Sequence, residues 1–144
     1  MDELEGYKVL SGADPAEDYI GPFYFKETES GYDFVFQANQ NHCNMTGIVH
    51  GGVLMTFADY CLCMVATDAY AEDCVTVSFN SEFISAGEID HLIKGAATIT
   101  LKTGSMVFVR GEVKQDDRIL MTFSSVVKRL RKKDCSLMRQ QRRK

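Results

Sequence analysis

Hydrophobic and polar positions along the chain mark out a series of short strands. Residues 32–36 mix aromatic and polar side chains in near alternation, and with the aromatic run 23–25 and a glycine turn at 29–31 they predict a β-hairpin. Later in the chain, four segments rich in Val, Ile, Phe and Thr favour strands. These segments are residues 75–84, 92–101, 106–114 and 119–128. Short polar stretches at 102–104 and 115–117 predict tight hairpin turns between the last three of them.

Between the hairpin and the four strands lies a stretch with a different pattern. From Val53 to Ala66 the chain has no Lys, Arg, Glu, Asn or Gln, so a helix beginning near Gly51 or Gly52 would be apolar all round and enclosed on nearly every side. The run is shorter than the roughly 20 residues that span a bilayer, and it contains Asp59, so no stable membrane insertion is expected. The order of elements predicts an α+β fold in which a curled antiparallel sheet wraps one long central helix.

Length and composition are those of one globular domain. The chain has 144 residues, of which 45% are hydrophobic and 25% are charged. These values exclude a wholly disordered protein and leave little room for a second domain. We expect a loosely structured lead-in at 1–22 that holds one short helix, the folded domain at 23–130, and a basic C-terminal tail at 131–144.

Charge is unevenly distributed along the sequence. Residues 128–144 hold nine Lys or Arg and one Asp, a net charge of +8, whereas the preceding residues carry −12, which together give the −4 of the whole chain. The basic tail is expected to be a solvated terminus, and the alternative is that it binds the phosphates of coenzyme A or an anionic surface. Nucleic-acid binding is not expected, because the rest of the molecule is acidic and no recognition motif occurs.

The N-terminal residues and the cysteines favour a cytoplasmic protein. The sequence begins Met-Asp-Glu-Leu-Glu, without the basic start and apolar stretch of a signal peptide. The number of cysteines is odd, and two of them lie within the apolar run, where thiols behave as small hydrophobic side chains. The five are Cys43, Cys61, Cys63, Cys74 and Cys135. We therefore expect reduced thiols and a reducing compartment.

One motif lies at the start of the predicted helix. It consists of Asn44, Gly47, the run His50-Gly51-Gly52 and, nine residues after the histidine, Asp59. This motif resembles the signature of hotdog-fold acyl-CoA thioesterases, in particular their PaaI-like branch from phenylacetate metabolism. The predicted elements agree with that fold from about residue 23 to residue 130. The resemblance implies a hydrolase that acts on an acyl-CoA substrate and requires no metal and no redox cofactor.

The glycines and the acid also have chemical roles that do not depend on the resemblance. Thioester hydrolysis develops negative charge on a carbonyl oxygen, and the backbone N–H of Gly51 at a helix start is a suitable donor. Gly51 and Gly52 would let an acyl group approach the backbone, although they could instead let the helix pass close to a strand. Asp59 would act as a general base on water or attack the thioester carbon directly. Its alternative is a structural acid bonded to a loop or a strand threonine.

The spacing of Gly51 and Asp59 predicts an oligomer. Eight residues span about 12 Å of helix at a rise of 1.5 Å per residue, whereas both groups must lie within roughly 3 Å of one carbonyl. A two-fold homodimer would solve this by bringing the helix start of one subunit to Asp59 of the other. The resemblance implies the same arrangement, often with dimers paired into a homotetramer.

The resemblance assigns roles to four further residues, Asn44 as a catalytic residue and the other three as supporting residues. Asn44 would orient the thioester or a water, with a local turn as the alternative, and His50 would orient the loop. Thr76 takes the place where related enzymes carry a polar residue near the acid, with an ordinary strand threonine as the alternative. Cys63 lies one helical turn after Asp59, where some relatives have a hydroxyl residue. The two helix cysteines point to different faces, so no metal site is expected.

Two other functions are compatible with the sequence. A non-catalytic acyl-CoA sensor or scaffold of hotdog fold would keep the pocket but show no turnover. A hotdog dehydratase typically pairs an Asp with a nearby His, and the position of His50 at the helix start does not suit that pairing. The acyl group itself is not defined, because aryl, short and long chains all remain compatible. Its pocket is expected to be shaped by Phe57, Tyr60, Phe79 and Phe83.

Overall fold

The computed structural model describes residues 2–130, which form six strands and three helical segments. The strands are β1 Phe23–Thr28, β2 Gly31–Phe36, β3 Cys74–Phe83, β4 Ile93–Lys102, β5 Met106–Gln115 and β6 Arg118–Arg129. The helical segments are α1 Pro15–Ile20, the short 3-10 helix η1 Gln40–His42 and α2 Gly51–Ala66. The predicted hairpin, helix and four strands are confirmed, with their ends displaced by about one residue. The basic tail at 131–144 lies outside the described residues.

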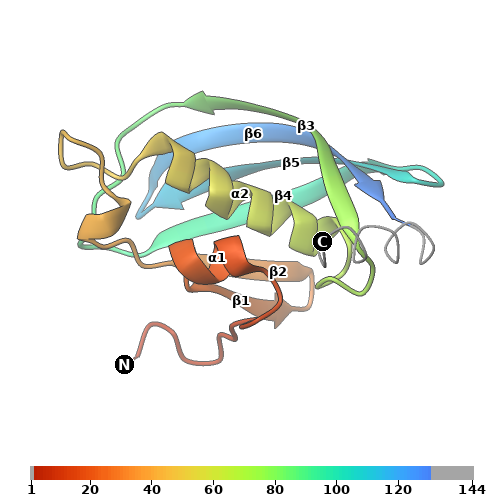
Figure 1. Ribbon diagram of the computed structural model, residues 1–144, viewed down its shortest axis with the longest axis horizontal. Helices are drawn as coiled ribbons and strands as arrows, with labels where there is room; N and C mark the ends of the chain where they lie inside the picture. The colour runs from red at the N-terminus through yellow and green to blue at the C-terminus, as the bar shows by residue number, and fades with distance from the viewer. Residues whose placement is uncertain (1, 131–144) are drawn as a thin grey trace, which may run out of the picture.

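All pairs of neighbouring strands are antiparallel, and the sheet has the order β1-β2-β4-β5-β6-β3. The sheet curls, and α2 lies along its inner face with α1 next to it (Figure 1). The predicted α+β fold, a curled antiparallel sheet around one long helix, is therefore confirmed. Among residues 2–130, no helix combines the length and the apolar character needed to cross a membrane.

The hydrophobic core fills the space between α2 and the sheet. Phe57 and Met64 of α2 and Phe36 of β2 are fully buried, and full burial of such a side chain stabilises the fold by about 1.5–3 kcal/mol. Helix and sheet approach each other closely where Cys61 faces Gly95, since a Cβ at Gly95 would come within 2.5 Å of the Cys61 sulfur. The apolar character of the helix is thus largely explained by burial.

One face of α2 departs from the predicted enclosure. Nine of its 16 residues are buried, yet Gly52, Met55, Thr56 and Asp59 line an open groove, and Met55 is 39% exposed. These positions recur at spacings of three and four residues, so they share one helix face. The expectation that the helix is enclosed on nearly every side is wrong for this face, because β3 flanks it without covering it.

The two outer strands of the sheet differ in how their free edges are covered. Beyond β1, Lys8 forms an antiparallel bridge to Phe25 through backbone hydrogen bonds of 2.8 and 2.9 Å. Beyond β3, no strand within residues 2–130 pairs. Val77 and Phe83 of β3 and the adjoining Ile84 are more than half exposed, at 55%, 53% and 57%. A long uncovered edge with apolar side chains is typical of a strand that pairs with another chain.

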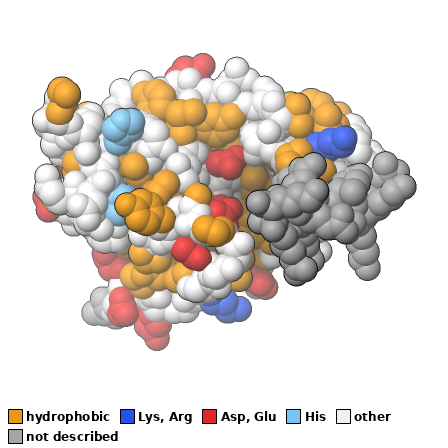
Figure 2. Space-filling view, viewed as in Figure 1, with side chains coloured by type: hydrophobic (Ala, Val, Ile, Leu, Met, Phe, Trp, Pro, Cys, Tyr) orange, Lys and Arg blue, Asp and Glu red, His pale blue; other side chains and the backbone are white. Residues whose placement is uncertain are grey.

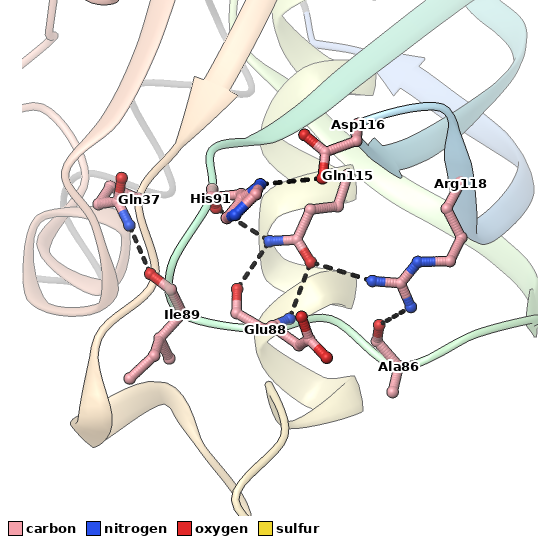
Figure 3. A network of polar contacts seen from close by, with 8 residues as sticks. All are labelled: Gln37, Ala86, Glu88, Ile89, His91, Gln115, Asp116 and Arg118. Atoms are coloured by element: carbon pink, nitrogen blue, oxygen red, sulfur yellow. Dashed lines mark hydrogen bonds and ion pairs between the residues drawn. The ribbon is translucent and has the colours of Figure 1, made fainter.

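A polar network holds the loop between β3 and β4 in place (Figure 3). The Gln115 side chain is almost wholly buried, and its Nε2 donates to the carbonyls of Glu88 and His91 at 2.7 and 2.9 Å. Its Oε1 accepts from the Glu88 N–H at 2.9 Å. In the same loop, the Gly87 carbonyl accepts a 2.9 Å hydrogen bond from the N–H of Val49. The network therefore supports the chain just before α2 begins.

Candidate active site

The start of α2 leaves one backbone donor free. His50 caps the helix, and its Nδ1 accepts a hydrogen bond of 2.9 Å from the Gly52 N–H. The His50 carbonyl accepts from the N–H groups of Val53 and Leu54 at 2.9 and 3.2 Å. The Gly51 N–H has no acceptor within residues 2–130. Free N–H groups at a helix start carry partial positive charge, so this one can donate to an anion.

Gly51 also lies against the end of β3. A Cβ at Gly51 would come within 3.1 Å of the Phe83 ring, and a Cβ at Gly52 would come within 3.1 Å of the His50 ring. Glycine at position 51 thus permits the helix to pass close to a strand, which was one of the two explanations open from the sequence. The two explanations are compatible, because the same missing side chain leaves the backbone N–H accessible.

Asp59 lies two turns further along α2 and faces β3. Its Oδ1 accepts a 2.6 Å hydrogen bond from the Thr76 hydroxyl, and the Cys63 thiol lies 3.9 Å from the same oxygen. The other oxygen, Oδ2, accepts no hydrogen bond from any of residues 2–130. The structure therefore brings Asp59, Thr76 and Cys63 together in one cluster, whereas Gly51 lies near the opposite end of the helix.

Burial raises the pKa of the Asp59 carboxyl. The hydrogen bonds from Thr76 and Cys63 act in the opposite direction, and the charge of Asp14 adds to the increase. Loss of hydration is the largest of these effects, so the net direction is upward. A carboxylate with a raised pKa accepts a proton more readily near neutral pH, which is the property that a general base needs.

A groove of about 430 Å³ opens between α2 and β3. It is lined by Gly52, Met55, Thr56, Asp59 and Phe79. On the side of the molecule that carries α2, acidic side chains lie among hydrophobic ones (Figure 2). A largely apolar groove with few polar groups is typical of a site for a small organic ligand. Here it would present such a ligand to one carboxylate, that of Asp59.

Asn44 is engaged in the loop before α2. Its Oδ1 accepts hydrogen bonds from the Thr46 N–H at 3.0 Å and from the Thr46 hydroxyl at 2.7 Å. Its backbone N–H donates to the Ile48 carbonyl at 2.8 Å, and Gly47 adopts a φ of +83° within the same turn. This is the local turn that the sequence left open as an alternative. Its Nδ2 donates to no group of residues 2–130 and is therefore the part of Asn44 that can contact a ligand.

A second acid lies near Asp59 without any motif that marks it in the sequence. Glu17 of α1 accepts a 3.1 Å hydrogen bond from the Tyr70 hydroxyl. Burial, followed by the charge of Asp14, raises the pKa of Glu17 to about 7, and the charge of Asp59 contributes to the increase. Glu17 lines a separate cavity of about 180 Å³ beside α1. Its position follows from the packing of α1 against α2, which the sequence pattern does not reveal.

The aromatic residues expected to shape the acyl pocket fall into two groups. Phe79 lines the groove, and Phe83 lies against the helix start. Phe57 is instead fully buried among the core rings and does not line the groove. Tyr60 is 2% exposed and lines the cavity beside α1. The cause is the helical turn, which directs Phe57 and Tyr60 away from the face that carries Asp59.

Together, the fold and the site define the class of protein. A curled antiparallel sheet around one long helix is the hotdog architecture, which thioester hydrolases share. In agreement, the sequence model of the Thioesterase superfamily matches residues 46–122, more than half of the chain, and the chain belongs to this family. The protein is accordingly an enzyme of the thioester hydrolase class.

Several known proteins are similar to most of the chain. "Putative esterase PA0474" of Pseudomonas aeruginosa is 25% identical over 129 residues, which cover 88% of this chain and 96% of that protein. The E. coli PaaI protein from the phenylacetic acid degradation operon has a TM-score of 0.74 at 13% identity, covering 83% of this chain and 86% of its own. The BH2602 protein from Bacillus halodurans, solved with CoA, has a TM-score of 0.72 at 19% identity, covering 85% and 82%. The two structural matches show the shared fold.

Proposed function

We propose that the protein hydrolyses acyl-CoA thioesters to the free acid and coenzyme A. The observation that carries this proposal is the state of Asp59. Its carboxyl is partly buried at an apolar groove, has a raised pKa, and is held through Oδ1 while Oδ2 has no partner among residues 2–130. Such a group lowers stability, so its presence favours a catalytic role. The coenzyme A bound to the Bacillus halodurans relative supports CoA as the leaving group.

The reaction would begin with Asp59 acting as a general base. The carboxylate takes a proton from a water in the groove, and the resulting hydroxide attacks the thioester carbon. The Gly51 N–H stabilises the oxyanion that forms. Collapse of this intermediate breaks the C–S bond, and the coenzyme A thiolate takes the proton back from Asp59. Direct attack by the carboxylate, followed by hydrolysis of the anhydride, would give the same products.

The proposed site requires two copies of the chain. Gly51 and Asp59 belong to one helix and are about 12 Å apart along its axis, so within one chain they cannot serve the same carbonyl. Pairing of β3 with its copy in a second chain would cover the exposed Val77 and Phe83 and continue the sheet. The helix start of one subunit would then face Asp59 of the other, in a homodimer that can pair further into a tetramer.

The remaining site residues would support this chemistry. His50 engages the Gly52 N–H and so leaves Gly51 as the oxyanion donor, while the Nδ2 of Asn44, unbonded in the described part of the chain, would orient the thioester or the water. Thr76 and Cys63 hold Oδ1 of Asp59. No step requires a metal or a redox cofactor. A cytoplasmic location is consistent with the free thiols of the cysteines in the described part of the chain.

A direct test is the variant Asp59→Asn, assayed against a panel of acyl-CoA substrates by release of coenzyme A. The amide can still accept the Thr76 hydrogen bond, so the fold should persist, while kcat should fall by roughly 10²–10⁴-fold. Asp117→Asn, which removes an exposed carboxylate from the β5–β6 turn, is the matched control and should retain full activity. Normal hydrolysis by folded Asp59→Asn protein would contradict the proposed mechanism.

A further inference from the structure

Two thiols from separate elements meet beside Asp59. Cys63 lies one turn after Asp59 on α2, and Cys74 is the first residue of β3. Because side chains alternate along a strand, Cys74 lies on the same face of β3 as Thr76. The side chains of Cys63 and Cys74 interact with each other, and the Cys63 sulfur is 3.6 Å from the Thr76 hydroxyl. The pair therefore adjoins the cluster that holds the carboxylate.

The two thiols are chemically unequal. The interaction with Cys63 is the largest influence on Cys74 and lowers the pKa of the Cys74 thiol, whereas the same interaction together with burial raises the pKa of the Cys63 thiol. Cys74 is partly exposed and Cys63 is 7% exposed. An accessible thiol with thiolate character next to a second thiol is the arrangement in which oxidation leads to a disulfide.

Cys61, only two residues from Cys63, provides a comparison within the same helix. Its sulfur is fully buried against Gly95 in the core, and burial raises the pKa of its thiol. It has the environment of an inert packing cysteine. The contact with Cys74 therefore distinguishes Cys63 from a cysteine that simply fills space.

We propose that Cys63 and Cys74 form a reversible oxidation site that controls the environment of Asp59. Hydrogen peroxide would oxidise the Cys74 thiolate to a sulfenic acid, with cleavage of the O–O bond and release of hydroxide. The Cys63 thiol would then attack the Cys74 sulfur, form the S–S bond and expel the oxygen as water. In total, two thiols and one peroxide give one disulfide and two waters. A dithiol such as dithiothreitol would reverse the reaction by exchange.

The disulfide would act on the site in two ways. It removes the Cys63 S–H, which now faces Oδ1 of Asp59 at 3.9 Å. It also ties the first residue of β3 to α2 one helical turn from Asp59, which lines the groove that would hold the acyl group. We expect the rate of acyl-CoA hydrolysis to fall by roughly tenfold, the equivalent of one lost positioning hydrogen bond. This expected loss of rate rests on the proposed function, whereas formation of the disulfide does not.

The experiment treats purified full-length protein with hydrogen peroxide, blocks free thiols with N-ethylmaleimide and maps peptides by mass spectrometry without reduction. A cross-linked pair of peptides holding Cys63 and Cys74 is expected, together with loss of activity that dithiothreitol restores. Cys74→Ser should abolish both effects. The double variant Cys43→Ser/Cys135→Ser is the matched control, because it removes two cysteines outside the pair and should keep both effects.

Several results would overturn the proposal. They are a Cys74 that proceeds to sulfinic acid without cross-linking, a disulfide between other cysteines, or an unchanged response of the Cys74→Ser variant. If Cys74→Ser fails to fold, Cys63→Ser and the peptide map of the wild-type protein decide the question alone. The experiment distinguishes failure of the oxidation site from failure of the proposed hydrolase function. A mapped Cys63–Cys74 disulfide in a protein without hydrolase activity would contradict only the function, and steady hydrolysis without a disulfide would contradict only the oxidation site.

Discussion

Gln115 and Asp59 are both polar side chains withdrawn from solvent, but their hydrogen bonding differs. Gln115 is 1% exposed, and both ends of its amide are hydrogen-bonded. Arg118 completes the surroundings through a 2.5 Å hydrogen bond to the Ala86 carbonyl and a 3.4 Å contact with the Gln115 oxygen (Figure 3). The cluster closes a loop and leaves no polar atom of the Gln115 side chain for a ligand.

Asp59 is less buried than Gln115, yet it has fewer hydrogen bonds to its polar atoms. Only its Oδ1 is bonded within residues 2–130, its pKa is raised by burial, and it faces a groove. A complete set of hydrogen bonds is typical of a structural polar group, whereas an incomplete set at a groove indicates a group that interacts with something else. The comparison therefore predicts opposite effects of mutation at the two residues: loss of stability at one, and loss of activity at the other.

The largest expected change in stability is at Gln115. In Gln115→Leu the volume is kept, but the Glu88 N–H and the Glu88 and His91 carbonyls lose their partner, which should lower the free energy of unfolding by about 3 kcal/mol. Urea unfolding monitored by circular dichroism measures this change in the free energy of unfolding. Gln37→Leu removes one hydrogen bond from an exposed amide to the same loop and should cost below about 1 kcal/mol. Asp59→Asn should be at least as stable as the wild type at pH 7, and an equal loss at Asp59 and Gln115 would contradict the comparison.

The next effect concerns the hydroxyl that holds Asp59. Thr76→Val keeps the shape but removes the donor that lowers the pKa of Asp59, so the acid limb of the pH–rate profile should move to higher pH. The rate at neutral pH should fall by about tenfold. The control is Thr122→Val, since Thr122 also bonds a carboxylate, Glu82, at 3.0 Å but on an exposed part of the sheet. A profile that moves equally in both variants would argue against a special role for Thr76.

The sequence predicts features that depend on neighbouring residues along the chain, but not those that depend on how distant elements pack. Alternation and apolar runs report burial, so the strands, the helix and the motif at its start follow from the pattern. The open face of α2 does not, because it depends on where β3 lies relative to the helix. Glu17 and Cys74 could not be assigned to the site for the same reason. The two-residue spacing of Cys74 and Thr76 does, however, place both on one face of the predicted strand.

A smaller, pH-dependent effect is expected at Glu17. Its pKa in the folded protein, about 7, exceeds the ordinary value of 4.5, so the fold favours the protonated acid. This contribution to stability is fully present below pH 4.5 and is lost as the pH rises through about 7. Glu17→Gln stays neutral and should be more stable than the wild type at pH 8 by about 1 kcal/mol, after allowance for solvent screening of a partly exposed carboxyl. At pH 5 the two should be similar, and Glu29→Gln in an exposed turn should show no such trend.

The smallest effect is expected at Tyr60, whose buried hydroxyl has no hydrogen-bond partner among residues 2–130. Tyr60→Phe keeps the ring packing and should change the free energy of unfolding by zero to about +1 kcal/mol, in the stabilising direction. Tyr70→Phe makes the same chemical change but removes the bond to Glu17, and should destabilise by about 1 kcal/mol. Thermal melts of the two variants show whether each is more or less stable than the wild type. A clear loss of stability in Tyr60→Phe would show that the Tyr60 hydroxyl has a hydrogen-bond partner in solution.

The measurement that tests the account most directly is subunit complementation between Asp59→Asn and Gly51→Pro. Proline is tolerated at the first position of a helix and removes the N–H that would stabilise the oxyanion, and the adjacent Phe83 ring would have to move by a few tenths of an ångström to admit it. Each variant alone should be nearly inactive, with melting curves that verify its fold. When the two are co-expressed with different tags, mixed dimers hold one intact site, and roughly a quarter of the wild-type activity should return in a random mixture. Activity that stays at the level of the separate variants, although mixed dimers are isolated by their two tags, would contradict a site shared between subunits.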